Sequence, residues 1–375
     1  MRVLIVARYF HEMMQKKLAC LCREPEMEIW HLVPSYWPDA HAAYQMRSRS
    51  RENHHQIAWP AIKAPDGHRF LYWPPPLMIR RLRPDLIHLD EEPESLVAVE
   101  FTLLRRFLAP RSKYVLFTWQ NIRRQTHPPV GAVARFSLRA ADGVICGNAG
   151  AVGVVRSYGY QGPVSIIPQT GVDPEDFAPL LRQEYRSRYG LTMFTAGFAG
   201  RLSEEKGLLV FLEAARPVRD MQAVCIGAGP LAENLRRMQT ESDWLGRLVL
   251  TGGLTLDETA RGFSALDALV LPSLTRPHWK EQFGRVLVEA MAAGVPVVGS
   301  DSGAIPEVIG DAGIIVAEGD PVALREALLR IKTDLSLRAD LVARGKARVL
   351  KRFTHPLIAS ATADFYRRIA GIERR

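Results

Sequence analysis

Cysteine is scarce in this sequence: the 375 residues contain four, at Cys20, Cys22, Cys146 and Cys225. They are scattered, and one residue separates Cys20 from Cys22, a spacing that does not match a zinc ribbon. The pattern therefore argues against a structural zinc site. It favours four reduced, mostly buried thiols in a cytosolic protein.

Long hydrophobic runs are also missing. No apolar segment approaches the roughly eighteen residues needed to span a bilayer. Residues 1–10, MRVLIVARYF, are too short and too quickly charged for a secretory signal, and they are typical of a buried strand. We therefore expect a cytoplasmic protein, with peripheral contact at the inner face of a membrane as an open alternative.

The sequence carries a net charge of +9 but lacks the aromatic-rich basic repeats of nucleic-acid-binding proteins. About half of the excess falls within residues 1–178, so the charge is spread over the chain. Arginine pairs such as Arg105 with Arg106 most often lie on solvated faces, although a basic membrane-facing patch is a second interpretation. We expect no nucleic-acid partner.

The length fits two ordinary domains with enough apolar content for two cores. Residues 1–34 follow a strand, helix, strand order, the unit of a parallel sheet, and the pattern starts again near residue 193. A turn at Gly171 and a proline-rich exit at Pro179 indicate the boundary. The expected domains are residues 1–178 and 179–354.

Polar residues follow two buried strands of the first half. Asp90, Glu91 and Glu92 come after the strand at 86–89, and Gln120 and Asn121 come after the strand at 114–119. The carboxyl ends of strands face the ligand crevice in an open parallel sheet, which makes these residues site candidates. A plain solvated turn is the alternative for the three carboxylates.

A glycine-rich turn follows the first strand of the second half. Gly200 is flanked by Arg201 and Lys206, and Gly207 opens a helix. A guanidinium and an ammonium at such a turn suit a diphosphate, because the guanidinium grips two oxygens and the ammonium neutralises the remaining charge. The alternative is a surface helix start with Ser203 as its N-cap.

Residues 281–294, EQFGRVLVEAMAAG, predict a loop followed by a helix that begins after Gly284. Gly294 stands where a C-terminal cap belongs. Such a helix start offers unpaired N–H groups to an anion. With Glu281 in the loop and Glu289 in the helix, the pattern fits a nucleotide sugar. Alternatively, Arg285 and Glu289 form only an exposed ion pair.

Gly227, Gly229 and Ala232 match the dinucleotide-binding fingerprint after a strand. The next strand ends at Thr251 and Gly252, where a nicotinamide-binding fold would place an acidic residue. This argues against a dehydrogenase.

Several segments in order resemble the retaining nucleotide-sugar glycosyltransferases of family 4, also called group 1: IIPQTGVDPEDFAP, GRLSEEKG, IGAGPL, LPSL and EQFGRVLVEAMAAGVPVV. The resemblance covers roughly residues 140–320. It implies the α/β GT-B fold, with two Rossmann-like domains whose parallel sheets face a central cleft. Residues 355–375 would form a helix that packs back on the first domain.

Carried over to this sequence, the resemblance implies that Arg201 and Lys206 stabilise the departing diphosphate and that Glu281 binds hydroxyls of the donor sugar. Glu289 would bind the ribose. The remaining expected donor contacts are Gly200, Leu254, Ser273, Phe283 and Gly284. The reaction would retain anomeric configuration without a metal or a tightly bound cofactor.

The first half departs from the family at two loops, ARYFHE and TWQN, where the family usually has a Gly-Gly pair and a histidine. The acceptor-side candidates are His11, Asp90, Glu91, Gln120 and Asn121. The loop with Arg276, His278, Trp279 and Lys280 is also longer than the family leads one to expect.

Our hypothesis is a glycosyltransferase that uses a UDP- or GDP-type sugar donor and a saccharide, lipid-linked or small-molecule acceptor, in polysaccharide, glycolipid or glycoconjugate biosynthesis. The altered loops motivate an alternative, a sugar-nucleotide-binding subunit with impaired catalysis. A glycosyltransferase for a soluble metabolite, and a phosphorylase or epimerase on the same architecture, are further alternatives.

Overall fold

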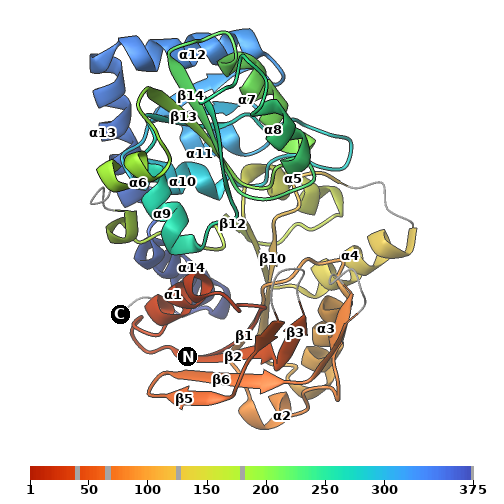
Figure 1. Cartoon of the computed structure of the whole chain (residues 1–375). Helices are drawn as coiled ribbons and strands as arrows, with labels where there is room; N and C mark the ends of the chain where they lie inside the picture. The colour runs from red at the N-terminus through yellow and green to blue at the C-terminus, as the bar shows by residue number, and fades with distance from the viewer. Residues whose placement is uncertain (39–42, 64–68, 124–127, 178–181, 373–375) are drawn as a thin grey trace. The chain divides into compact units, whose positions relative to one another are not determined.

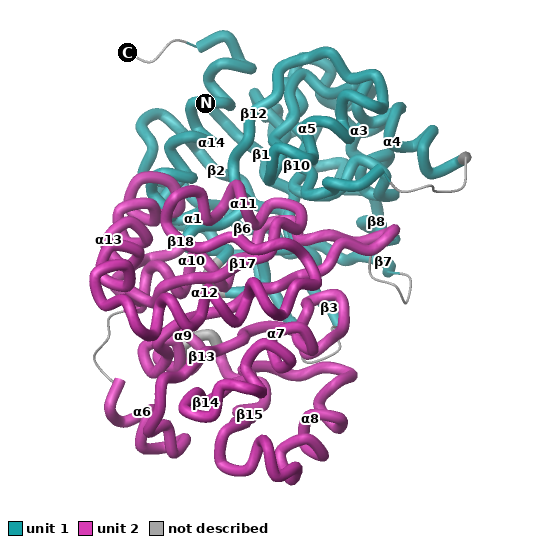
Figure 2. The backbone as a smooth tube through the Cα atoms, turned by 90° about the horizontal axis from the view of Figure 1, so that it is seen from above, with its two compact units in different colours: residues 1–171, 355–375 teal, residues 172–354 magenta. Residues whose placement is uncertain are grey.

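The computed structural model describes residues 1–38, 43–63, 69–123, 128–177 and 182–372. The chain divides into two compact units, coloured separately in Figure 2. The first unit combines Met1–Gly171 with His355–Arg375, and the second unit is Val172–Thr354. The predicted boundary between residues 178 and 179 lies outside the described residues.

The first unit is built on an eight-stranded sheet in the order β12-β11-β10-β9-β1-β2-β6-β5. Its strands run parallel except β5, which pairs antiparallel with β6. The strands are β1 (Arg2–Val6), β2 (Glu28–Pro34), β5 (Arg49–Arg51), β6 (His54–Trp59), β9 (Leu86–Leu89), β10 (Lys113–Thr118), β11 (Gly143–Cys146) and β12 (Val164–Ile166).

Helices cover both faces of this sheet, which explains why its central strands are almost wholly apolar. On one face, α1 (Glu12–Leu21) packs with the last helix of the chain, α14 (His355–Ala370). The opposite face is covered by α2 (Ile79–Leu82), α3 (Leu96–Leu108), α4 (Pro128–Ala140) and α5 (Ala149–Ser157). These elements are labelled in Figure 1.

The described residues between 35 and 76 form short strands and turns. Two hairpins lie outside the main sheet: β3 (Tyr36–Pro38) with β4 (Ala43–Gln45), and β7 (Ala61–Lys63) with β8 (Phe70–Tyr72). Within the same segment β6 joins the main sheet beside β2, a pairing that the sequence pattern did not predict.

The second unit has a six-stranded, entirely parallel sheet in the order β15-β14-β13-β16-β17-β18. Its strands are β13 (Phe194–Ala199), β14 (Met221–Ile226), β15 (Leu248–Gly252), β16 (Ala268–Leu271), β17 (Val297–Ser300) and β18 (Gly313–Val316). All of β14 and β16 is buried.

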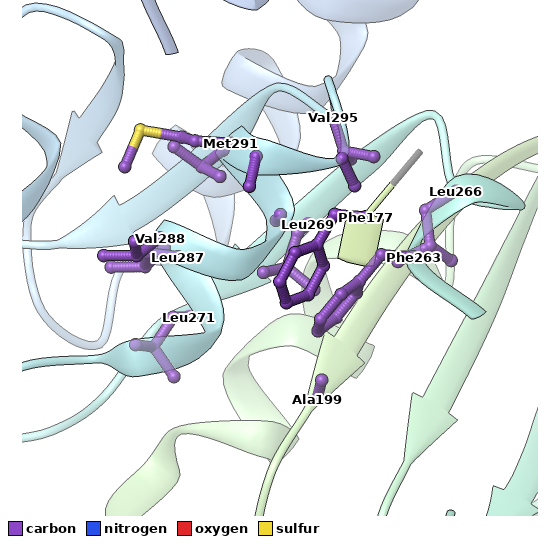
Figure 3. Close-up of a cluster of buried hydrophobic side chains, with 14 of the residues drawn as sticks. Phe177, Ala199, Phe263, Leu266, Leu269, Leu271, Leu287, Val288, Met291 and Val295 are labelled. Atoms are coloured by element: carbon purple, nitrogen blue, oxygen red, sulfur yellow. The ribbon is translucent and has the colours of Figure 1, made fainter. Parts of the chain in front are cut away.

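Helices again lie on both faces of the second sheet. One core packs α9 (Leu256–Ser264), α10 (Arg285–Ala292) and α11 (Ile305–Ile309) against it, and Figure 3 shows the buried side chains there. The other core uses α7 (Leu208–Ala215), α8 (Ala232–Met238) and α12 (Pro321–Thr333). The remaining helices are η1 (Pro174–Phe177), α6 (Arg182–Arg188), η2 (Glu204–Lys206) and α13 (Leu335–Arg352).

The strand order reverses once inside each sheet. In the first unit, β1 lies between β2 and β9; in the second, β13 lies between β14 and β16. Loops leaving the carboxyl ends of such neighbouring strands turn to opposite faces and leave a crevice between them. The predicted α/β class with two parallel sheets is confirmed, and its topology places the ligand crevices after β1 and β9 and after β13 and β16.

Replacing Leu269 by alanine tests the core of the second unit. Leu269 lies on β16 and is fully buried in the cluster of Figure 3. We expect Leu269→Ala to lower the free energy of unfolding by about 2–5 kcal/mol, because it removes apolar contacts and leaves a cavity. Urea denaturation followed by circular dichroism measures this loss.

The control is Leu209→Ala on α7, where the side chain is 38% exposed. We expect it to cost about 1 kcal/mol or less. Equal losses for the two variants would contradict the assigned core.

Candidate functional site

The loops after β13 and β16 are held against each other at the carboxyl edge of the second sheet. The N–H of Leu274 donates to the carbonyl of Glu205 at 2.8 Å. Gly207 has φ +70°, and a Cβ on it would lie 1.7 Å from the carbonyl oxygen of Pro272. Only glycine fits there, so the glycine that opens α7 also sets how closely the two loops approach.

Lys206 meets Glu281 in this crevice. The Nζ atom of Lys206 lies 2.7 Å from Glu281 Oε2, and Ser273 Oγ donates to the same oxygen at 2.9 Å. Glu281 is buried, whereas Lys206 is partly exposed. The structure therefore brings three predicted site residues together from two separate loops.

Gly284 begins α10 next to these groups. It is the N-cap, with φ +76°, and a Cβ on it would lie 2.8 Å from Leu271 Cδ2 and 3.7 Å from Glu281 Cγ. The Glu281 side chain thus lies beside the start of α10, whose first N–H groups have no partner within the helix. Phe283 is partly buried against the neighbouring core.

Glu289 forms an ion pair with Arg285, but its carboxylate is buried, unlike that of an exposed ion pair. The Arg285 Nε atom lies 2.8 Å from Glu289 Oε1. Arg285 is 44% exposed but Glu289 only 2%. Burial raises the pKa of Glu289, and the Arg285 charge opposes that rise. An exposed ion pair is therefore the wrong description of this buried carboxylate.

Arg201 is exposed, and its side chain forms no hydrogen bond or ion pair with any residue in the described ranges. Its charge acts nearby, on Glu205. Burial, the largest single effect, would raise the pKa of Glu205, but a hydrogen bond from Ser203 and several smaller effects together outweigh burial and lower the pKa. The charges of Arg201 and Lys206 add to that lowering, so both cations act on the same turn.

Glycines that resemble a dinucleotide fingerprint have a packing role here. A Cβ on Gly227 would lie 2.0 Å from the carbonyl of Gly200, and one on Gly229 would lie 2.5 Å from the carbonyl of Leu202. These glycines let the loop after β14 approach the turn that follows β13. Leu254 lies after β15 and packs against the core that contains α9 and α10.

The described residues of the first unit enclose a cavity of about 770 Å³ at the carboxyl edge of its sheet. Four acceptor-side candidates line it: His11, Asp90, Glu91 and Gln120. The fifth, Asn121, is buried and is not part of the lining. Aromatic side chains form much of the remaining wall: Tyr9, Phe10, Trp37, Phe117 and Trp119.

Asp90 and Glu91, which follow β9, are buried and hydrogen-bonded, so the alternative of a solvated turn is wrong for them. Arg8 donates two hydrogen bonds to the Glu91 carboxylate, from Nε at 2.5 Å and from a terminal nitrogen at 2.8 Å. Asp90 accepts from the Tyr9 hydroxyl and from Gln169 Nε2, the latter at 2.7 Å. Burial raises the pKa of Glu91, and the Arg8 charge opposes that rise.

Glu92, the third carboxylate predicted as a site candidate after this strand, also lines the cavity. Its carboxyl accepts from Thr118 Oγ1 at 2.5 Å and from the Trp119 N–H at 3.0 Å. Burial, followed by the neighbouring Glu94 charge, raises the pKa of Glu92 to about 8. Its position directly after a buried strand was the available signal.

Within the described ranges, no group of three or more His, Cys, Asp or Glu side chains is arranged to hold a metal ion. Among the same residues, none of the helices has both the length and the apolar character to cross a membrane.

The match to a known protein family lies within the second unit. Residues 194–334 match the family model described as Glycosyl transferases group 1. The chain is 29% identical over 268 residues to the 2-deoxystreptamine glucosyltransferase of Streptomyces kanamyceticus, covering 68% of this chain and 67% of that protein.

A second relative is the GDP-mannose-dependent alpha-(1-6)-phosphatidylinositol monomannoside mannosyltransferase of Mycobacterium tuberculosis. It is 31% identical over 208 residues, which cover 52% of this chain and 54% of that protein. The chain therefore spans about half to two thirds of the length of these curated relatives.

Solved structures extend the likeness of fold to nearly the whole chain. Anabaena HepE in complex with UDP superposes with a TM-score of 0.76 at 18% identity, over 97% of this chain and 99% of that chain. Sucrose-phosphate synthase from Thermosynechococcus elongatus gives a TM-score of 0.73 at 18% identity, over 99% of both chains. The predicted GT-B class is thereby confirmed at the level of fold.

The pKa of Glu92 predicts a pH-dependent effect of Glu92→Gln on stability. From about pH 4.5 to 8 the unfolded chain releases a proton that folded Glu92 keeps, so this group makes the wild type less stable as pH rises. Glutamine has no such proton. The stability of the variant relative to wild type should therefore increase through this window, by at most about 1.4 kcal/mol per pH unit.

Urea denaturation at intervals from pH 5 to 8 measures this trend. The control is Glu52→Gln, because Glu52 is an exposed glutamate of the same unit. A stability difference for Glu92→Gln that stays constant with pH would refute the raised pKa.

Proposed function

Because residues 194–334 match the family model of the group 1 glycosyl transferases, we propose that this protein transfers a sugar from a nucleoside-diphosphate sugar to an acceptor hydroxyl, with retention of anomeric configuration. The observation that carries the proposal is the contact between Lys206 and Glu281 beside the start of α10. One group suits a phosphate and the other suits a sugar hydroxyl, and both lie at the crevice where such folds bind ligands.

The donor diphosphate would bind between the turn after β13 and the start of α10. Breaking the anomeric C–O bond leaves growing negative charge on the nucleoside diphosphate. Lys206, Arg201 and the first N–H groups of α10 stabilise that charge, by about 3 kcal/mol for each well-placed donor if the loss of an oxyanion-hole donor is a fair guide. No metal is required for this stabilisation.

The carboxylates would bind the hydroxyl groups at the two ends of the donor. Glu281 is assigned to the donor sugar, and Lys206 and Ser273 hold its carboxylate in place through Oε2. Glu289 is assigned to the ribose. Its Oε1 lies 2.8 Å from Arg285 Nε, so the carboxylate that would accept from a ribose hydroxyl is already ion-paired.

The acceptor would occupy the cavity of the first unit. A volume of about 770 Å³ with aromatic walls suits a saccharide ring, because aromatic faces pack on the C–H faces of sugars while carboxylates accept from hydroxyls. His11, Asp90, Glu91 and Gln120 are the acceptor-side contacts in this proposal. A phosphate oxygen of the leaving group would take the acceptor proton on the same face.

The names of the relatives indicate acceptors of several kinds, from 2-deoxystreptamine to a phosphatidylinositol mannoside. We assign this chain to polysaccharide, glycolipid or glycoconjugate biosynthesis in the cytoplasm, with peripheral membrane contact if the acceptor is lipid-linked. The donor is of the UDP or GDP type.

One observation favours a second function, a sugar-nucleotide-binding subunit without catalysis. In the loop after β1, where the family usually has a Gly-Gly pair, this chain has Arg8, which donates two hydrogen bonds to Glu91. Assays of donor hydrolysis and sugar transfer with a panel of nucleotide sugars separate the two functions, because a pure binder shows affinity without releasing a nucleoside diphosphate.

Thermal unfolding with UDP, GDP, ADP and dTDP identifies the donor base. A ligand that binds only the folded state stabilises it by about 2.7 kcal/mol at a concentration one hundred times its dissociation constant. We expect a raised melting temperature with UDP or GDP, and a smaller shift with the others. No shift with any of the four would contradict nucleotide-sugar binding.

Lys206→Ala tests the assigned leaving-group role. We expect turnover to fall by about two to three orders of magnitude, because the variant loses a charged donor aimed at the departing diphosphate. The measurement is release of nucleoside diphosphate under saturating donor and acceptor.

The control is Lys351→Ala, since Lys351 is exposed on α13 of the same unit and should be dispensable. Circular dichroism must show that both variants are folded. Near-normal turnover of a folded Lys206→Ala protein would reject the role.

A further inference from the structure

Trp279 covers the ammonium group of Lys206. The Nζ atom of Lys206 lies 4.9 Å from the centroid of the indole ring, within the range of a cation–π contact. The same ammonium pairs with Glu281 Oε2 at 2.7 Å. The chain between β16 and α10 therefore restrains Lys206 twice, once with a carboxylate and once with an aromatic face.

The loop that carries Trp279 is fixed where it leaves β16. The N–H and the hydroxyl of Thr275 both donate to the carboxylate of Glu318. Arg276 and Trp279 then exchange backbone hydrogen bonds, at 2.7 Å and 3.2 Å, which close a tight turn. These contacts hold the backbone of the turn that carries Trp279.

The other end of the loop is also clamped. The N–H of Ala304 donates to the carbonyl of Glu281 at 2.9 Å. Gly303 has φ +55°, and a Cβ on it would lie 2.0 Å from that carbonyl oxygen, so the segment after β17 approaches as closely as glycine permits. Trp279 and Glu281 thus reach Lys206 from one loop whose two ends are both held by hydrogen bonds.

From this geometry we infer that Trp279 is a positioning residue of the donor site, which holds the Lys206 ammonium where it receives the diphosphate of the nucleotide. The inference rests on the proposed function and specifies how that site is organised. Lysine has a flexible four-carbon side chain whose ordering opposes binding. An indole that orders the ammonium beforehand reduces this cost, and it also excludes water from one side of the charge.

A purely structural role for Trp279 makes a different prediction. If the indole only packs the loop, its loss affects nucleotide binding by the same factor whether or not Lys206 is present. If it acts through the ammonium, its loss has little effect once Lys206 is gone. A double-mutant cycle distinguishes the two roles, because it isolates the coupling between the two side chains.

The cycle uses isothermal titration with whichever of UDP, GDP, ADP and dTDP gives the largest thermal shift. The proteins are wild type, Trp279→Leu, Trp279→Phe, Lys206→Ala and the double variant Lys206→Ala with Trp279→Leu. We expect Trp279→Leu to weaken binding about threefold to tenfold. Trp279→Phe should keep most of the affinity because it keeps an aromatic face, and Trp279→Leu should change affinity less than about twofold in the Lys206→Ala background.

The control is Trp73→Leu, an exposed tryptophan of the first unit, which should leave nucleotide affinity unchanged. Equal factors in both backgrounds, or wild-type affinity in Trp279→Leu, would overturn the inference and leave the proposed function intact. Failure of the wild type to bind any of the four nucleotides would instead overturn the proposed function and the inference together.

Discussion

The reversal of strand order between β14, β13 and β16 is the constraint on which the candidate donor site depends. Because neighbouring strands send their loops to opposite faces, the turn carrying Lys206 and the loop carrying Glu281 meet at one edge although 75 residues separate them. Glycine at position 207 allows their backbones to touch. Without that close approach the ammonium and the carboxylate would each lie in solvent, and nothing would distinguish this edge from an ordinary sheet surface.

The same topological rule builds the first unit, with a different chemical result. Around the reversal between β2, β1 and β9, the loops enclose a cavity whose wall combines carboxylates with aromatic rings. Burying carboxylates is costly unless each is paired or protonated. Arg8 pairs with Glu91, whereas Glu92 keeps its proton until about pH 8. Asp90 and Glu91 are therefore parts of a buried polar network rather than independent surface charges.

The helix after Gly284 could be predicted from its pattern, and the last helix near residues 355–370 from the family resemblance. The segment 35–76 could not, because β6 gains its place in the sheet from pairing with β2, far from its own sequence neighbours. The burial of Asp90 and Glu289 was missed for a related reason. A charged residue after a strand or on a helix gives the same sequence pattern whether or not the rest of the fold covers it.

The sequence by itself determined the two parallel sheets, the glycine turns and the residue types that suit a nucleotide sugar, since these depend on local propensity and on spacing along the chain. Only the tertiary structure decided which of those residues meet. It brought the Trp279 ring over Lys206, paired Arg8 with Glu91 and left Arg201 exposed. Such pairings depend on how loops from distant strands approach one another, and that approach is set by backbone packing at glycines such as Gly207 and Gly303, which no local pattern encodes.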